Sequence, residues 1–275
     1  MWDKVMSGIL KTRLRQAKGW VQEARWKSSL QLRHRLHRGD FLVDYGGFRL
    51  LFTNDDDYQE VRYRMNAKRW FDYERETLKP WLKHSDTVID VGANSGFLTI
   101  LFAQLVGESG KVYSFEPAEK IFKKLLKTID GNLVNNVRPI NFACGAEMGE
   151  SVLKSVSNSS GHSTFVPTVK AGEEISAEKV RILCLDDFVM KEELRVDFLK
   201  IDTEGFEAEV LKGCSAILRE HKPVVYIELT AGERLDLSRL AIDILREHGY
   251  SFTKEMDLAS LDSEKNFIAL PDHLA

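Results

Sequence analysis

The chain has 275 residues, of which 43% are hydrophobic and 29% charged, with 18 glycines and only 6 prolines. This composition is that of a globular protein and excludes disordered, collagen-like and membrane-spanning chains. The length allows one ordinary domain with an appendage, or at most two small domains.

Charge is unevenly distributed along the chain, whose formal net charge is -3. Residues 1 to 40 contain ten Lys and Arg against three Asp and Glu, so the rest of the chain carries -10. Apolar residues are interleaved with these cations, among them Trp2, Leu14, Trp20 and Trp26. The mixture suits basic helices that lie on an anionic lipid surface. The alternative is a helix that packs on the body or on a second subunit.

The cysteines and the lack of a long apolar run indicate the cellular compartment of the protein. Cys144, Cys184 and Cys214 are odd in number and far apart, which fits neither a disulfide framework nor a zinc site and favours buried thiols. No segment approaches the ~20 apolar residues that span a bilayer, and the charged start has no signal-peptide core. The sequence therefore predicts a cytoplasmic protein, at most peripheral at a membrane.

The first predicted elements precede the main fold. Phe41 to Phe52 gives two short β-rich runs around Gly46 and Gly47, the strongest hairpin signal in the chain. We expect a small cap or an edge ribbon there. The three aspartates at positions 55 to 57 then offer N-cap side chains to a helix from about Tyr58 to Leu82.

Buried strands and helices then alternate, which predicts a doubly wound α/β fold, a mostly parallel sheet with helices on both faces. The predicted strands are Thr87 to Val91, Lys111 to Phe115, Arg138 to Phe142, Asp197 to Ile201 and Pro223 to Leu229. Crossover helices start near Ser95, Ala118, Glu204 and Leu237. Two final β-like runs, Tyr250 to Lys254 and Asn266 to Leu270, suit an antiparallel C-terminal hairpin at the sheet edge.

One stretch, from Glu150 to Arg181, breaks this rhythm because it is rich in Ser, Gly, Thr and Val and has little helical periodicity. We interpret it as an inserted β-arm or lid beside the active site. The chain thus divides into a basic helical extension at 1–40, a hairpin and helix at 41–84, and an α/β domain at 85–275 with the arm at about 150–181.

A tight turn follows the first strand of the expected sheet, in Thr87-Val-Ile-Asp-Val-Gly-Ala-Asn-Ser-Gly96. Gly92 and Gly96 let the backbone approach a ligand, and the following helix aims free N–H groups at it. A dinucleotide site would have a glycine where Asn94 stands. Asp90, ahead of the turn, suits an ammonium and a sulfonium better than two phosphates. The turn therefore favours S-adenosylmethionine as the ligand.

An acidic residue, Glu116, ends the second strand in Ser-Phe-Glu-Pro. A carboxylate at this position can accept both hydroxyl groups of a ribose. Taken alone, the turn is an ordinary strand-to-helix connection and Glu116 is a solvated strand end. Occurring together in this order, the two motifs predict a nucleotide site.

Carboxylates also end the fourth and fifth strands. Asp202 and Glu204 follow the fourth strand, and Glu228 ends the fifth. Ligands of open α/β sheets bind beyond the carboxyl ends of the strands. We therefore expect these side chains where the methyl donor meets its acceptor. The structural alternatives are that Glu204 caps its helix and that Glu228 pairs with a lysine.

Four motifs follow one another along the chain: Asp-Val-Gly-Ala-Asn-x-Gly, Phe-Glu-Pro, Leu-Asp-Asp-Phe at 185 to 188 and Lys-Ile-Asp-x-Glu-Gly-x-Glu. As a set they resemble the motifs of the FkbM family of methyltransferases. The resemblance extends over about Phe71 to Leu270 and includes Tyr73-Glu74, the stretch Asn158 to Thr164, Gly213 and Asn266. It does not include residues 1–40.

The resemblance implies a seven-stranded class I methyltransferase sheet, S-adenosylmethionine as the methyl donor, and a hydroxyl acceptor on a sugar, a glycolipid or a polyketide. By position, the implied cofactor residues are Asp90, Gly92, Ala93, Asn94, Gly96, Glu116, Pro117 and Asp202, with Asn141 to Gly145, which include Ala143 and Cys144, near the adenine. Cys144 is a departure, because many relatives have a small aliphatic residue there.

Methyl transfer from a sulfonium is an in-line displacement, and the hydroxyl proton must leave as the new bond forms. The candidate bases are His162 in the arm and the carboxylates Glu74, Asp202, Glu204 and Glu228. Alternatively, Asp202 and a second carboxylate hold a divalent ion that lowers the pKa of the hydroxyl. No metal-ligand spacing is visible in the sequence, so we favour a carboxylate or histidine base.

Other functions stay open from the sequence. The missing central glycine and the carboxylates after the fourth strand argue against a nicotinamide-dependent dehydrogenase. A non-catalytic binding or scaffold protein of the same fold would keep the motifs without turnover. Nucleic-acid methylation is disfavoured, because the body is acidic and lacks an Asn-Pro-Pro-Tyr-type motif. We therefore expect a small-molecule, glycan or glycolipid acceptor and no nucleic-acid partner; the oligomeric state is open.

Overall fold

A computed structural model describes residues 28, 39–53, 56, 64–156, 163–165, 175–230, 234–254 and 265–274. The basic extension predicted at residues 1–40 therefore lies almost entirely outside the described residues, and so does His162. No helix in the described ranges is long and apolar enough to cross a membrane.

Seven strands form the central sheet, in the order β12-β13-β11-β10-β3-β4-β5. Parallel pairing joins β3 (Thr87–Val91), β4 (Lys111–Phe115), β5 (Val137–Ile140), β10 (Phe198–Ile201) and β11 (Val224–Leu229). The C-terminal strands are β12 (Tyr250–Phe252) and β13 (Lys265–Pro271), and β13 is antiparallel to both of its neighbours. The predicted mostly parallel sheet with an antiparallel C-terminal hairpin is confirmed.

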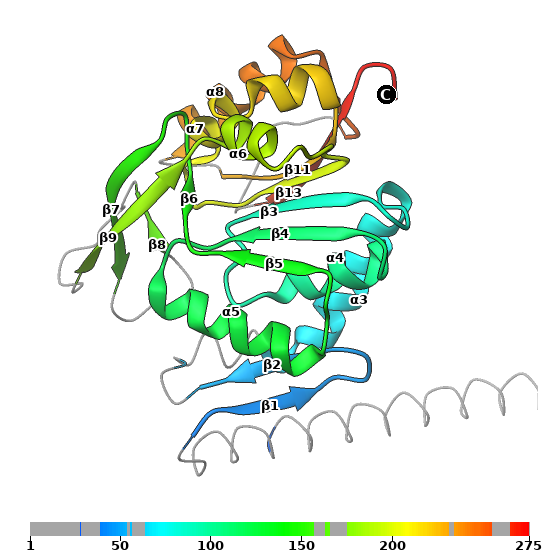
Figure 1. Cartoon of the computed structure of the whole chain (residues 1–275), viewed down its shortest axis with the longest axis vertical. Coiled ribbons are helices and arrows are strands. Elements are labelled where there is room, and N and C mark those ends of the chain that lie inside the picture. Colours follow the sequence, from blue (N-terminus) through cyan, green and yellow to red (C-terminus); the bar gives the residue numbers. More distant parts are fainter. Residues whose placement is uncertain are drawn as a thin grey trace, which may run out of the picture.

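Helices cover both faces of this sheet (Figure 1). One face carries α3 (Ala67–Leu78), α4 (Phe97–Val106) and α5 (Glu119–Asn132). The other face carries α6 (Leu185–Lys191), α7 (Glu207–Lys212) and α8 (Leu235–Glu247). Because alternate residues of a strand point to opposite faces, each central strand contributes apolar side chains to two cores. Strands buried on both faces read as continuous apolar runs, which is why the sequence located them.

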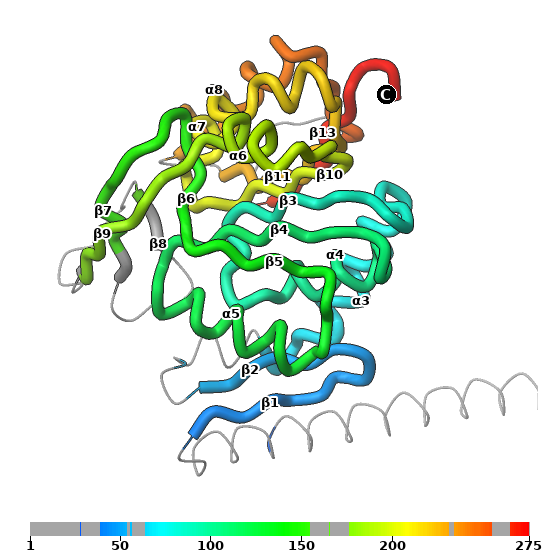
Figure 2. Tube along the Cα trace, viewed as in Figure 1, coloured from blue at the N-terminus to red at the C-terminus, as the bar shows by residue number. Residues whose placement is uncertain are grey.

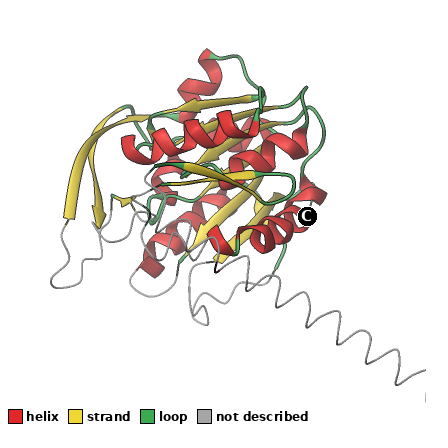
Figure 3. Cartoon of the chain, turned by 90° about the horizontal axis from the view of Figure 1, so that it is seen from below, coloured by secondary structure: helices red, strands yellow, loops and turns green. Residues whose placement is uncertain are grey.

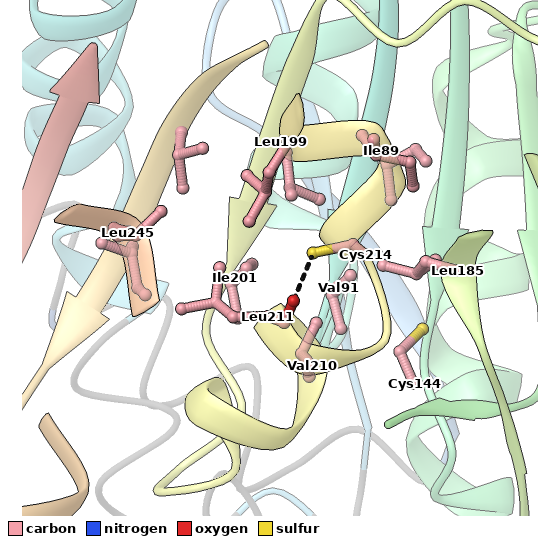
Figure 4. Close-up of a cluster of buried hydrophobic side chains, with 14 of the residues drawn as sticks. Ile89, Val91, Cys144, Leu185, Leu199, Ile201, Val210, Leu211, Cys214 and Leu245 are labelled. Carbon is pink, nitrogen blue, oxygen red and sulfur yellow. Dashed lines mark hydrogen bonds between the residues drawn. The ribbon is translucent and has the colours of Figure 1, made fainter. Parts of the chain in front are cut away.

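The core under α6, α7 and α8 contains two of the three cysteines. Figure 4 shows Cys144 and Cys214 among aliphatic side chains of β3, β10 and α7. Both thiols are buried, and burial raises their pKa values well above the ordinary range. Cys184 is only partly buried, so the expectation of buried thiols is confirmed for two of the three residues.

Some predicted boundaries were wrong. The third strand ends at Ile140, and Ala143–Cys144 forms a separate short strand, β6, in a second sheet. The helix expected near Glu204 begins only at Glu207. Two further helical segments were not predicted, α6 and the π-helical turn Ile217–His221. Each spans fewer than eight residues, too short a window for helical periodicity to be visible.

The N-terminal hairpin is confirmed and consists of β1 (Phe41–Asp44) and β2 (Arg49–Phe52). Gly46 and Gly47 turn it, with φ angles of +78° and +124° that favour glycine. The hairpin packs against the helices and does not join the central sheet. Arg49 Nη1 donates to Gly131 O of α5, and Phe48 stacks on Phe71 of α3. Figure 2 shows it beneath α5.

The aspartates predicted to cap the following helix have another role where the structure describes them. Asp56 is buried, accepts hydrogen bonds from Thr53 N and Oγ1, and forms ion pairs with Arg64 (3.4 Å) and Lys124 (2.8 Å). It thereby connects the segment after the hairpin to α5. Positions 55 and 57 lie outside the described residues. The described part of the helix is interrupted by a turn at Asn66 before α3, and a 3-10 turn, Lys79–Trp81, follows α3.

The stretch interpreted as an arm contains antiparallel strands. β7 (Gly149–Val156) pairs with β9 (Ile175–Leu183), and β6 and β8 (Ser163–Thr164) complete a four-stranded sheet in the order β6-β9-β7-β8. The long β7–β9 pair projects from the body (Figure 3). Since β6 follows the carboxyl end of β5 by two residues, the base of the arm lies at the carboxyl edge of the central sheet. A lid role and the domain limits stay predictions.

Candidate active site

The turn between β3 and α4 is held by backbone hydrogen bonds to the neighbouring strand, β4. The N–H groups of Gly92 and Ala93 both donate to Phe115 O of β4, at 3.0 and 2.9 Å. Gly92, Asn94 and Gly96 have φ angles of +73°, +50° and +94°. A Cβ atom on Gly92 would lie 1.7 Å from Asp202 O, and one on Gly96 would lie 2.9 Å from Leu125 Cδ1. The glycines therefore let the turn pack against neighbouring elements. The sequence prediction considered only the approach of the backbone to a ligand and did not include this packing.

Glu116 is 6% exposed, so the alternative that it is only a solvated strand end is wrong. Its Oε2 accepts the N–H of Asn94 at 3.0 Å, and its Oε1 accepts the N–H of Ala118 at 2.9 Å. Burial raises the pKa of Glu116 to about 7, although both hydrogen bonds lower it. The backbone around it is held by Asn141, whose side-chain amide donates to the carbonyls of Glu116 and Pro117. A buried carboxyl thus lies directly beside the β3–α4 turn.

A row of polar side chains crosses the centre of the sheet on the α3 and α4 face. Lys200 of β10 is in register with Asp90 of β3 and with Tyr226 of β11, so the three side chains share one face. Asp90 is fully buried, and the Thr99 hydroxyl donates to its Oδ2 at 2.6 Å.

Lys200 lies between two carboxylates, those of Asp90 and Asp202. Its Nζ lies 3.3 Å from Asp90 Oδ1 and 3.4 Å from Asp202 Oδ2, and it donates to Gly92 O at 2.6 Å. Burial alone would lower the pKa of Lys200, but the charges of Asp202, Asp90 and Glu228 raise it above its ordinary value. Lys200 had no predicted role, although a lysine inside the apolar run Phe-Leu-Lys-Ile was a usable signal.

A further carboxylate reaches this row from α3. Tyr226 OH donates to Glu74 Oε2 at 2.7 Å. Burial raises the pKa of Glu74, and the charge of Asp202 adds to the shift. Burial and the Glu74 carboxylate likewise raise the pKa of Tyr226 above the ordinary range. The fold thus brings three predicted carboxylates together around Lys200, namely Glu74, Asp202 and Glu228. Tyr226 was missed, although it interrupts an aliphatic strand.

Glu204 is directed elsewhere. It adopts a left-handed backbone conformation, with φ of +57°, and its Oε2 lies 3.0 Å from Arg234 Nη1. Glu207, the first residue of α7, braces the loop before the helix, because its Oε1 accepts the N–H groups of Thr203 at 2.9 Å and Gly205 at 3.1 Å. The alternative that Glu204 caps its helix is therefore wrong, because the N-cap residue of α7 is Phe206 and it makes no side-chain cap.

Of the stretch expected near the adenine, Asn141 to Gly145, two residues form β6. Ala143 and Cys144 are both buried, and the Cys144 side chain points into the second core (Figure 4). Only the backbone of Cys144 is thus left to border a ligand. His162 lies outside the described residues.

The donor set fits S-adenosylmethionine. Asp90 Oδ1 is buried and ion-paired with Lys200 at 3.3 Å but accepts no hydrogen bond among the described residues, so it keeps acceptor capacity for a ligand. Glu116 supplies a second carboxyl beside the same turn, where a ribose would reach it. Within the described ranges, no group of three or more His, Cys, Asp or Glu side chains is arranged to hold a metal ion.

The strand order and this donor set define a class I S-adenosylmethionine-dependent methyltransferase. Residues 90–252 match the family model described as the methyltransferase FkbM domain. Because the match spans more than half of the chain, the protein belongs to the FkbM methyltransferase family, and the resemblance noted in the sequence is confirmed. Its methyl donor is S-adenosylmethionine.

Curated relatives are distant. Over 143 aligned residues the chain is 26% identical to methyltransferase 1 of Beauveria bassiana. The aligned region covers 46% of this chain and 57% of the fungal protein. Over 219 residues it is 25% identical to the hexuronic acid methyltransferase AglP of Haloferax volcanii, covering 76% of this chain and 82% of AglP. Among solved structures, an FkbM methyltransferase from Methylobacillus flagellatus superposes with a TM-score of 0.44 at 18% identity, covering 77% of this chain and 55% of the other.

Proposed function

We propose that this methyltransferase transfers the methyl group of S-adenosylmethionine to a hydroxyl oxygen of a sugar, as a free sugar or as part of a glycan or glycolipid. The observation that carries this proposal is the convergence of Glu74 and Asp202 on Lys200, immediately beside the Gly92 turn. Carboxylates accept hydrogen bonds from hydroxyl groups and can remove a hydroxyl proton. The similarity to AglP, a hexuronic acid methyltransferase, supports the same class of acceptor.

In this proposal the cofactor lies over β3 and β4. Asp90 attracts its ammonium group, and the Glu116 carboxylate accepts its ribose hydroxyls. The Gly92–Gly96 turn, including Ala93 and Asn94, supplies backbone groups, and Pro117, Ala143 and Cys144 border the adenine. Two observations support this placement, the Asp90 Oδ1 atom that accepts no hydrogen bond among the described residues and the Glu116 carboxyl already bonded to the turn.

The acceptor then lies over β10 and β11, next to Glu74, Asp202 and Glu228. Such a site must hold the acceptor oxygen in line with the methyl carbon and remove its proton. Five side chains named from the sequence are candidates for the base. Glu204 is the weakest of the described ones, because Arg234 already neutralises its charge. His162, in the arm, stays a candidate on sequence grounds alone.

The proposal is tested by incubating the protein with S-adenosylmethionine labelled in its methyl group. The acceptors are a methyl glucoside, a methyl glucuronide, a total glycolipid extract and a phenolic polyketide, each with and without EDTA. We expect label in a sugar-containing acceptor. Label only in the polyketide would contradict the sugar assignment. Cofactor binding without transfer to any acceptor would indicate the non-catalytic alternative, and loss of transfer in EDTA would indicate a metal requirement.

A further inference from the structure

The carboxylates of the acceptor side differ in their counter-ions. Among the described residues, Asp202 lies 3.4 Å from the Lys200 ammonium, and Glu204 lies 3.0 Å from the Arg234 guanidinium. Glu74 instead accepts a hydrogen bond from a neutral group, the Tyr226 hydroxyl, at 2.7 Å. Glu74 is thus held in place by a neutral hydrogen-bond donor.

This difference separates the candidates by basicity. An ammonium or guanidinium next to a carboxylate favours its charged form and makes it a weak proton acceptor. A general base works best when its proton affinity matches the working pH, and burial raises the proton affinity of a carboxylate. Asp202 and Glu204 each pair directly with a cation, whereas the hydrogen-bond partner of Glu74 is neutral and burial raises the pKa of Glu74 even though Lys200 lowers it. Glu74 is therefore the better placed base.

We propose that Glu74 is the general base of the methyl transfer and that Tyr226 is a positioning residue that orients the Glu74 carboxylate toward the acceptor hydroxyl. This inference rests on the proposed function. As the acceptor oxygen bonds to the methyl carbon, the carbon–sulfur bond breaks and its electron pair stays on the sulfur. The hydroxyl proton passes to Glu74, and Asp202 stays paired with Lys200 at 3.4 Å.

The pH dependence follows from the groups that face Glu74. Among the described residues these are Tyr226 of β11, Lys200 of β10 and Asp202 after β10. Burial raises the pKa of Glu74, the Tyr226 hydrogen bond lowers it, Asp202 raises it and Lys200 lowers it, and the net shift is upward. Removing the Tyr226 hydroxyl therefore raises the pKa of Glu74 further.

Rates test the proposal with the acceptor that the labelling experiment identifies. Glu74→Gln keeps an oxygen for the Tyr226 hydroxyl, and we expect kcat to fall about 10²-fold or more while cofactor affinity changes less than about threefold. Tyr226→Phe should move the acidic limb of the kcat profile to higher pH. Two matched controls should leave kcat and its pH profile unchanged: exposed Glu76→Gln on the same helix, and Tyr250→Phe, whose buried hydroxyl donates to Pro223 O.

A second measurement needs no acceptor. Carboxyl carbon NMR of the protein saturated with S-adenosylhomocysteine follows the titration of Glu74, whose signal is assigned by its loss in Glu74→Gln. We expect the titration to lie above the ordinary glutamate range, and higher still in Tyr226→Phe. An unchanged titration in Tyr226→Phe, or a Glu74→Gln protein with the wild-type rate, would overturn the proposal. If wild type methylates no acceptor, the proposed function fails, and the NMR titration still decides whether Tyr226 sets the basicity of Glu74.

Discussion

At the scale of single residues, Lys200 has the largest electrostatic role in the site. Its ammonium lies between Asp90, which is fully buried, and Asp202, which is partly exposed. Removing one member of a buried ion pair leaves the other charge uncompensated. Lys200 therefore stabilises the fold and compensates the charge of two functional carboxylates.

We expect Lys200→Met to lower the free energy of unfolding by about 3 to 5 kcal/mol, because Asp90 loses its only described counter-ion. Urea denaturation followed by circular dichroism measures the change. The matched control is Lys212→Met, whose exposed pair with Glu209 should contribute less than about 1 kcal/mol. Equal stability of Lys200→Met and wild type would show that the buried charges are not coupled as described.

Glu116 gives a prediction for pH. Its pKa is raised from 4.5 to about 7 by burial, so the folded protein holds this proton more tightly than the unfolded chain. Stability therefore falls as the pH rises from about 4.5 to 7, by up to about 1.4 kcal/mol per pH unit for this group. Denaturant midpoints across this window measure the slope.

The Glu116→Gln variant should lose the part of the pH dependence of stability that Glu116 contributes. Some pH dependence should stay, since burial also raises the pKa values of Glu74 and Glu207. Exposed Glu119→Gln is the matched control and should keep the wild-type slope. A wild-type slope in Glu116→Gln would mean that Glu116 is already ionised in the folded protein at low pH.

Sequence reasoning found the residues that occur in short ordered motifs and missed those defined by packing. Asp90 lies near the end of β3 and Glu116 directly follows β4, each in a short motif at a fixed place in the fold, so their positions were predictable. Lys200 and Tyr226 lie inside strands, where only the register with neighbouring strands shows that their side chains meet. The burial of Glu116 and the pairing of Glu204 with Arg234 likewise depend on contacts between distant segments.

At the scale of elements, close approach of α7 to the strand before the arm depends on Gly213. A Cβ atom there would lie 2.0 Å from Gly145 O, a backbone atom that cannot move alone. The φ angle of Gly213 is -81°, so backbone strain does not contribute. The requirement for glycine is therefore purely one of space.

We expect Gly213→Ala to destabilise the protein by about 1 to 3 kcal/mol, as overpacking of a tight contact does. The matched control is Gly149→Ala, because a Cβ atom there meets nothing within 4 Å. Urea denaturation of the two variants compares them directly. Equal stability of the two would mean that α7 shifts away from the Gly145 backbone without cost.

The parallel strands were predictable to within a residue or two, since strands buried on both faces are continuous apolar runs between turns. The arm was recognised only by its departure from this rhythm. Its sheet is built mainly on the pairing of β7 with β9, two strands that are far apart in the sequence. The short α6 and the π-helical turn are set by tertiary packing and had no periodic signal.

At the scale of the whole molecule, the basic N-terminal extension stays a prediction. Its mixture of cations and aromatic residues predicts binding to anionic lipid, and each cation contributes about 1 kcal/mol near such a surface. Vesicle flotation of the full chain and of a chain that starts at Asp40 compares anionic with neutral lipid. We expect only the full chain to float with anionic vesicles at low salt. Failure to float there would favour packing on the body or on a second subunit.

The central claim is that the β3–α4 turn and Glu116 together bind S-adenosylmethionine. Isothermal titration calorimetry at pH 8, where Glu116 is ionised, tests it with S-adenosylmethionine and S-adenosylhomocysteine. We expect wild type to bind both, and Glu116→Ala to bind about 10²-fold more weakly or worse, because each lost charge-assisted bond contributes about 1.5 to 3 kcal/mol. Absence of binding heat with wild type, or equal affinity of Glu116→Ala, would contradict the account.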